Sequence, residues 1–458
     1  MCSGTNDSGS MEDKNMARVY ISFLGTNDYV ECRYLDEFDT PEPVRFVQEA
    51  TIGTICRGWG PGDRITIFTT TDAEKKNWED NGHYDKDNKR YKECKGLKRC
   101  LEELKLTAPF ANVHIPDGHS TEEMWDIFQK VFDSLNERDE VVFDITHALR
   151  SIPLLAIVVL HYAKVLKRVS LKGIYYGAFE ALGSIADVRA RPVEERRAPV
   201  LDLTDLDKLM DWTMATDRFL QGGDARSAAA LAKAEAEREL KKTRGKDEAA
   251  KAIRSLGCGL EDFSKMLYTC RGREISKAST ELKKRAKECR NLKLPKPFRP
   301  LFEMIEKRLE AFKGDSLLDG LAAVRWCVDH NLVQQGFTIL EEIVFSHTLS
   351  GVGLDASDTR LRYVASQAYT IVSRNLDDNP VEWESPARGE EEYTRRMIDF
   401  IRGHEDLRSA VATLRARRND LNHAGFIEKQ VSLQKAGDFA EDLERLLGRI
   451  EAALTSDF

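Results

Sequence analysis

The chain has 458 residues, 41% of them hydrophobic and 32% charged, with a formal net charge of −8. Its length suits two or three domains, and its composition is that of a soluble globular protein. The negative net charge excludes a general attraction to nucleic acid, so any grip on an anionic polymer must come from local basic patches.

The cysteine pattern and the apolar runs indicate the compartment. The nine cysteines include no C-x-x-C pair, so neither a disulfide framework nor a zinc site is indicated, and reduced thiols in the cytoplasm are the simplest interpretation. The longest apolar run, 152–160, is shorter than the ~18 to 20 residues of a membrane span. Residues 1–15 lack the apolar core of a signal peptide, and we expect a disordered tail there.

Strand and helix patterns alternate over residues 16–199. The β-rich stretch RVYISFLG is the first expected strand, and later expected strands end in the stretch VSLKGIYYGAF. The expected strands are 18–25, 44–55, 64–69, 112–115, 139–144 and 169–179, and the expected helices are 96–106, 121–135 and 154–166. This order predicts an α/β, Rossmann-like domain with a parallel, doubly wound sheet.

The stretch DEVVFDITHALRSIP, residues 139–153, reads as a strand that turns into a helix. The strand ends at Asp144, and Ser151 suits the helix N-cap. The new helix would present unpaired backbone N–H groups beside Thr146, His147 and Arg150, which is a suitable place for phosphate. The alternative is an ordinary connection whose polar residues only cap the helix and contact water.

A second polar loop, Gly25 with Thr26 and Asn27, follows the first expected strand. Doubly wound sheets bind ligands at the carboxyl ends of their strands, beside the point where the strand order reverses. Both loops therefore qualify as ligand loops. The G-x-G-x-x-G fingerprint is missing, which argues against a dinucleotide cofactor, and we expect neither a cofactor nor a metal.

The chain changes character after residue 183. The stretch 183–204 carries two prolines and many charges, so we place the domain boundary at 199/200. Helical patterns follow to the end, and 200–458 is expected to be all α. The basic stretch 271–299 has a local balance of +8, which indicates either a nucleic-acid surface or a solvated helix.

A second group of polar residues lies in the segment DLRSAVATLRARRNDLNHAGF. Arg418 stands where the apolar stripe of this helix should continue. A guanidinium at such a position needs either an ion-pair partner or a water-filled cleft. Asn419 and His423 are four residues apart on the neighbouring face. A structural arginine and a capping histidine are the alternative interpretation.

Arginine and histidine together suit metal-free cleavage of RNA by its own 2′-hydroxyl. Histidine can move protons at neutral pH, and arginine can stabilise the charge that builds on the phosphate. Arg418 and His423 are five residues apart, however, which separates them by ~140° on a straight helix. One helix would not aim both at one phosphate unless it bends or a second copy supplies the other wall.

Taken together, the chain resembles the CRISPR-associated ribonucleases of type III systems that join a CARF domain to a HEPN domain. The loops LGTNDY and DITHALRS are similar to the two ligand motifs of CARF domains, and RNDLNH matches the R-x4-H motif of HEPN nucleases. The resemblance covers nearly all of the chain and implies a CARF domain at 16–199 and a HEPN domain at 200–458. The charged segment 225–251 has no counterpart in these motifs and is interpreted as an insertion.

The resemblance implies a single-strand endoribonuclease that is switched on by cyclic tetra-adenylate or hexa-adenylate. Both domains pair in the family, so a homodimer is implied, with the two R-x4-H motifs in one composite cleft. The implied catalytic residues are Arg418 and His423, supported by Asn419. The implied ligand residues are Gly25, Thr26, Asn27, Asp144, Thr146, His147, Arg150 and Ser151. Arg415, Arg417 and the stretch 271–299 are expected to grip RNA.

Three other functions stay open at this point. A regulator without enzymatic activity would sense a nucleotide through its α/β half and bind a partner through its helical half. A CARF ring nuclease would degrade the cyclic oligoadenylate itself, with Thr26, Asn27 or His147 contributing. An ordinary Rossmann enzyme is disfavoured by the missing glycine fingerprint.

Overall fold

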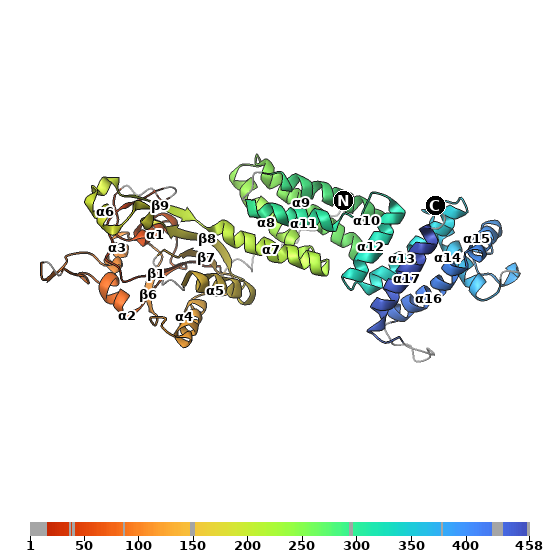
Figure 1. The fold of residues 1–458 in the computed structure, drawn as a ribbon, viewed down its shortest axis with the longest axis horizontal. Coiled ribbons are helices and arrows are strands. Elements are labelled where there is room, and N and C mark those ends of the chain that lie inside the picture. The colour runs from red at the N-terminus through yellow and green to blue at the C-terminus, as the bar shows by residue number, and fades with distance from the viewer. Residues whose placement is uncertain are drawn as a thin grey trace, which may run out of the picture. The chain divides into compact units, whose positions relative to one another are not determined.

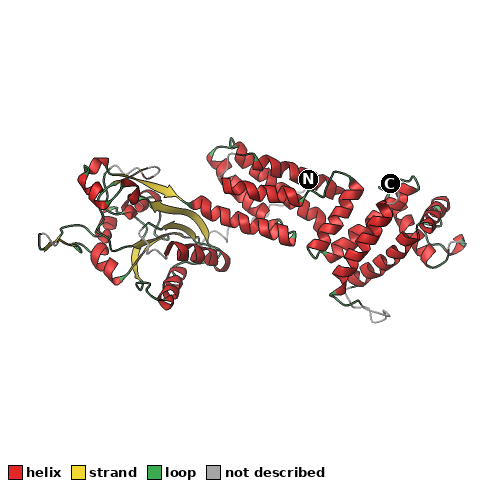
Figure 2. Ribbon diagram, in the orientation of Figure 1, coloured by secondary structure: helices red, strands yellow, loops and turns green. Residues whose placement is uncertain are grey.

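The computed structural model describes residues 16–35, 38, 42–85, 88–146, 152–292, 296–376, 379–423 and 434–455. The chain divides into two compact units, and the division falls between Lys208 and Leu209 within helix α7 (Thr204–Gly222). Figure 2 shows that the strands belong to the first unit, while the second is built from helices. The predicted order, an α/β half followed by an all-α half, is confirmed.

The first unit is built on a seven-stranded sheet in the order β2-β9-β8-β7-β1-β3-β6 (Figure 1). Its strands are β1 (Arg18–Leu24), β2 (Arg33–Leu35), β3 (Arg64–Thr69), β6 (Phe110–His114), β7 (Glu140–Asp144), β8 (Ser170–Gly177) and β9 (Arg197–Asp202). The five strands from β8 to β6 are parallel, and β9 runs antiparallel to β8. The chain order reverses between β1 and β7, so the switch point of a doubly wound sheet lies between these strands.

Alternate side chains of β1 pack on opposite faces of this sheet. Val19 and Phe23 pack in one apolar cluster with α4 (Thr121–Asp133) and α5 (Ile152–Leu166). Tyr20 and Leu24 pack in another with α1 (Val47–Ile55) and α3 (Leu97–Glu103). Helices therefore cover both faces, as a parallel sheet requires. A short hairpin, β4 (Tyr84–Asp85) with β5 (Arg90–Tyr91), stands apart from the sheet.

The expected strand at 44–55 is wrong, because most of this segment forms helix α1. Its β-branched residues suit a strand, but the Glu49 carboxylate accepts the backbone N–H groups of Arg45 and Phe46 at 3.1 and 2.9 Å. These bonds satisfy donors at the helix start, and burial of Val47 and Ile52 under the sheet outweighs the weak local preference.

The stretch 183–204 is also more ordered than a linker. It holds helix α6 (Ile185–Ala190) and strand β9, which joins the sheet between β2 and β8. Proline lacks an N–H group and usually argues against an inner strand, yet Pro199 accepts the backbone N–H of Ala178 at 2.9 Å. The first unit consequently extends past residue 199.

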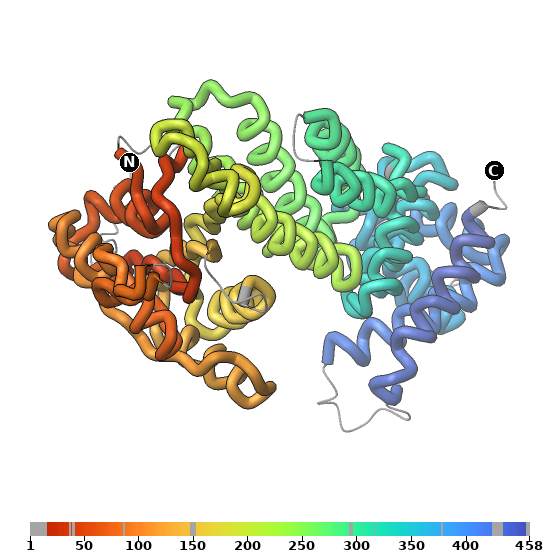
Figure 3. The backbone as a smooth tube through the Cα atoms, turned by 60° about the vertical axis from the view of Figure 1, so that its left-hand side comes forward, coloured from red at the N-terminus to blue at the C-terminus, as the bar shows by residue number. Residues whose placement is uncertain are grey.

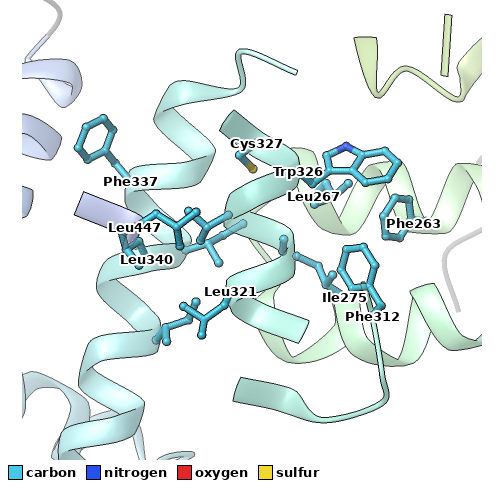
Figure 4. Packing of buried hydrophobic residues seen from close by; sticks show 14 of the residues in the cluster. Phe263, Leu267, Ile275, Phe312, Leu321, Trp326, Cys327, Phe337, Leu340 and Leu447 are labelled. Atoms are coloured by element: carbon cyan, nitrogen blue, oxygen red, sulfur yellow. The ribbon is translucent and has the colours of Figure 1, made fainter. Parts of the chain in front are cut away.

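The second unit is a set of packed helices around one apolar core (Figure 3). Figure 4 shows Trp326 beside Phe263 and Phe312, and Leu340 beside Leu447. The Phe263 and Trp326 rings meet edge to face at 5.2 Å. Besides most of α7, its helices are α8 (Arg226–Lys242), α9 (Glu248–Tyr268), α10 (Gly272–Arg290), α11 (Arg299–Arg308), α12 (Ser316–Asp329), α13 (Val333–Gly351), α14 (Thr359–Ser373), α15 (Glu391–Gly403), α16 (Glu405–Asn422) and α17 (Asp438–Thr455).

The helices and cysteines of the structure bear on the questions of a membrane span and of disulfides. Within the residues that the structure describes, no helix is both long and apolar enough to cross a membrane. The eight described cysteines, Cys32 to Cys327, are all free thiols.

Candidate functional site

The first predicted ligand loop leaves β1 at the switch point of the sheet. Its backbone is held by Asn77, a fully buried residue of the π-helical turn Glu74–Trp78. The Asn77 amide donates to the carbonyl oxygens of Gly25 at 2.8 Å and Asn27 at 2.9 Å. Thr26 and Asn27 are exposed. The loop is thus rigidly supported from below while its tip faces outward.

The second predicted ligand loop leaves β7, the neighbour of β1, and begins at a buried carboxylate. Asp144 accepts hydrogen bonds from the Tyr20 hydroxyl at 2.8 Å and the Thr51 hydroxyl at 3.2 Å. It also accepts the Thr146 backbone N–H at 2.9 Å and hydroxyl at 2.6 Å. Burial raises the Asp144 pKa, and these hydrogen bonds oppose the rise.

Asp144 therefore positions the loop instead of facing a ligand. Its side chain is fully buried, so the expectation that it contacts ligand directly does not fit its place. The Thr146 hydroxyl, which Asp144 orients, also accepts the backbone N–H of Gly177 at 2.8 Å. His147, Arg150 and Ser151 lie outside the described residues.

A cavity of about 370 Å³ opens between these two loops and the end of β8. Asn27 and Thr146 line it, which brings one predicted residue from each loop to the same place. Neither Gly25 nor Thr26 is among its lining residues. The other polar lining residues are Asp28, Tyr29, Tyr34, Arg45, Tyr176, Glu180 and Ser184.

The cavity wall carries a compact charge network around Asp28. Its carboxylate lies 2.5 Å from the Lys92 ammonium, 2.8 Å from the Arg189 guanidinium and 3.6 Å from that of Arg45. Burial would raise the Asp28 pKa, but the hydrogen bond and charge of Lys92, with the charges of His83 and Arg189, hold the pKa below its ordinary value. Of these three cations Arg45 lines the cavity itself, so its guanidinium is the positive charge that an anionic ligand there can meet directly.

The sequence prediction missed several residues of this site, among them Asn77 and Arg45. Asn77 supports the first loop, and the Arg45 guanidinium donates to the Asn77 side chain at 3.2 Å while it also lines the cavity. Asn77 follows β3, which lies next to β1 in the sheet. Because parallel strands end at one edge of a sheet, polar residues after the expected strand 64–69 were the signal that could have found it.

The other predicted residues lie at the C-terminal end of α16 in the second unit. The Arg418 guanidinium lies 2.7 Å from the carboxylate of Glu341 on α13, whose side chain is only 3% exposed. The Arg415 guanidinium lies 3.3 Å from the same carboxylate. Burial raises the Glu341 pKa, and the charges of Arg418 and Arg415 oppose this rise. This pairing explains how an arginine is tolerated in the apolar seam.

Asn419 and His423 do not share the surroundings of Arg418. Both are exposed, and His423 is the residue that ends the helix. The Arg418 Nε atom is buried and has no hydrogen-bond partner among the described residues. Within one chain, Arg418 therefore points inward to α13 and His423 lies at the exposed end of the helix, as the ~140° between positions 418 and 423 predicts.

Arg415 and Arg417, which were expected to bind RNA beside the motif, form contacts with other residues of the second unit. Arg415 donates to the Ser366 carbonyl at 3.0 Å and pairs with Glu341, while Arg417 donates to the buried Asp442 carboxylate on α17 at 2.8 Å. The expectation that these two side chains hold RNA does not fit these contacts. Their task is to fix α16 against α13, α14 and α17.

Comparisons with known proteins match two parts of this chain. Residues 19–180 match the CARF domain of the CRISPR system endoribonuclease Csx1. This range contains both loops and the cavity between them. Residues 19–180 therefore form a CARF domain of the kind found in a CRISPR-associated endoribonuclease.

A second match concerns the helices that follow the CARF domain. Residues 208–316 match the second domain of CRISPR-associated protein MJ1674. The MJ1674 protein of Methanocaldococcus jannaschii is 32% identical over 111 residues, which are 24% of this chain and 16% of that relative. The chain therefore spans about one sixth of the length of this curated relative.

The second match changes the interpretation of the helical half. The segment 225–251, interpreted above as an insertion, lies within the matched domain. Its alanines, including Ala228, Ala232 and Ala236, are buried where α8 packs on α9. The R-x4-H motif, from Arg418 to His423, lies outside both matched ranges. The predicted HEPN domain at 200–458 thus shares its range with a separately recognised domain.

Proposed function

We propose that this protein is a cyclic-oligoadenylate-activated endoribonuclease that cleaves single-stranded RNA without a metal. The match of the first unit to the CARF domain of an endoribonuclease carries the proposal. The cavity at the switch point, with Asn27, Thr146 and the Arg45 guanidinium in its lining, suits an anionic nucleotide such as cyclic tetra-adenylate or hexa-adenylate. The R-x4-H residues supply the chemistry.

The proposal includes a homodimer, and the exposed face of α5 supports it. Leu154, Val158, Tyr162 and Val165 are 71%, 50%, 47% and 69% exposed and recur every three or four residues. Such an apolar row on a helix is characteristic of an interface. Because α5 starts directly after the second ligand loop, pairing through this face would bring two ligand loops together.

The chemistry requires Arg418 and His423 to act on one phosphodiester. His423 would move the proton of the 2′-hydroxyl or of the leaving oxygen, and Arg418 would stabilise the negative charge in the transition state. Within one chain these side chains take different directions. In a composite cleft between two subunits, the R-x4-H motifs of both chains would face the same phosphodiester.

One assay separates this proposal from its rivals. The protein is incubated with labelled single-stranded RNA in EDTA, with and without cyclic tetra-adenylate or hexa-adenylate. Cleavage that needs ligand but no metal supports the proposal. RNA left intact under all these conditions contradicts it and favours the regulator, for which a purely structural Arg418–Glu341 pair would suffice. Chromatography of the ligand from the same tubes reports ring-nuclease activity.

Asn77→Asp is expected to weaken binding of cyclic tetra-adenylate by about tenfold or more. Aspartate cannot donate to the carbonyl oxygens of Gly25 and Asn27, and losing hydrogen bonds in a buried position costs on the order of 1–3 kcal/mol each. Calorimetric titration of the full-length protein measures the change.

The matched control is Asn112→Asp in the same domain. The Asn112 side-chain oxygen accepts from the Thr69 hydroxyl at 2.6 Å, so an aspartate there keeps the bond. Equal affinities of both variants for the ligand would show that the first loop does not take part in binding.

A further inference from the structure

The helix α10 carries a row of lysines without an ion pair or side-chain hydrogen bond to any residue that the structure describes. Its buried side includes Ile275, Leu282 and Ala286, which pack in the core of the second unit. Its opposite side presents Lys277, Lys284 and Lys287, all exposed. None of the described carboxylates forms an ion pair with these three lysines.

Three other cations of the helix are held by the protein, while Arg273 in its first turn is exposed like the lysines. The Lys283 ammonium donates to the Phe312 carbonyl at 2.9 Å, the Arg285 guanidinium to the Ser255 carbonyl at 3.1 Å, and Arg290 pairs with Glu306 at 2.9 Å. The net charge of the basic stretch therefore resides, among the described residues of α10, mainly on a side that faces solvent.

The three lysines share one side of the helix. Positions 277 and 284 are nearly eclipsed at seven residues' spacing, and position 287 lies three residues further on and ~60° around the helix, so the row extends over about 15 Å. Glu274, Glu281 and Glu288 repeat at the same spacing on one flank of the row. The exposed side of α10 is thus divided into a positive row and a negative row, and a polyanion can lie along the positive one.

The N-terminal end of α10 lies close to the candidate catalytic arginine. Cys270, in the turn between α9 and α10, is near both Arg271 and Arg418, whose charges oppose the rise that burial causes in its thiol pKa. The helices α10 and α13 are also in contact, and Glu341 of α13 holds Arg418. The lysine row and the R-x4-H arginine thus belong to one packed unit and are connected through α13.

We infer that Lys277, Lys284 and Lys287 bind the phosphate backbone of the single-stranded RNA substrate. This assigns a substrate-binding surface to the domain that resembles the second domain of MJ1674. It rests on the proposed function for the identity of the substrate. The lysines contact phosphates without reading bases, so the surface adds affinity with little sequence preference.

The test compares two triple variants in a His423→Ala background, which prevents cleavage under the proposed mechanism. K277Q/K284Q/K287Q removes the row, and K241Q/K246Q/K251Q removes the same charge from exposed lysines at the α8–α9 end of the unit. Fluorescence anisotropy with a labelled single-stranded RNA is measured over a range of salt, with and without cyclic tetra-adenylate.

Loss of three phosphate contacts should lower the salt slope, log K against log salt, by about 2 and the affinity at 0.1 M salt by roughly 10- to 100-fold. The control variant should keep the parental slope and affinity. Equal slopes and affinities for both variants would overturn the inference. If intact protein never cleaves RNA but the row variant alone loses RNA binding, the proposed nuclease fails while the surface stands.

Discussion

His423→Ala is expected to lower the rate of ligand-stimulated RNA cleavage by about 10²- to 10⁴-fold, which is the usual contribution of a general acid or base. Alanine cannot move a proton, but His423 is exposed at the end of α16, so the fold should not change. Single-turnover cleavage of labelled RNA in EDTA measures the rate. Ligand affinity should stay at its original value, because the CARF domain is untouched.

The control for this prediction is Asn422→Ala, which alters the neighbouring exposed residue and the same helix end. Its cleavage rate should stay within a few fold of the unaltered protein. Full cleavage activity of His423→Ala would contradict the R-x4-H mechanism. A similar loss of cleavage rate in both variants would indicate damage to the helix end.

Glu341→Ala should destabilise the second unit by about 3 kcal/mol. Removing one partner of a buried ion pair leaves charges without compensation, and here both Arg415 and Arg418 would lose their carboxylate. Both side chains are about 30% exposed or less, which places the cost at the lower end of the usual 3–5 kcal/mol. Chemical denaturation followed by helix circular dichroism measures the loss.

Glu342 provides the matched comparison on the adjacent position of α13. It pairs with Arg362, but its side chain is 46% exposed. A solvent-exposed pair contributes about 0–1 kcal/mol, so Glu342→Ala should have a much smaller effect. Comparable losses for the two variants would mean that Glu341 is not the buried anchor of Arg418, and that α16 is held chiefly by its apolar contacts.

The ligand loops illustrate how far local patterns predict a site. The β-formers before Gly25 and the run that ends at Asp144 located the ends of β1 and β7 because a strand followed by a polar turn is a short-range signal. The place of both loops beside the switch point then followed from the rule for doubly wound sheets. The role of Asp144 could not be predicted, since Tyr20 and Thr51 reach it only after the sheet and α1 have packed.

The sequence by itself determined the order of an α/β half and a helical half, the two polar loops after β1 and β7 and the anomalous position of Arg418. These are properties of segments about ten residues long, in which period and residue type are visible. Only the tertiary structure decided that Asn77 supports the first loop, that β9 completes the sheet, and that Glu341 pairs with Arg418. Such contacts join residues far apart in the chain, and their partners are selected by the packing of whole elements, which no local pattern records.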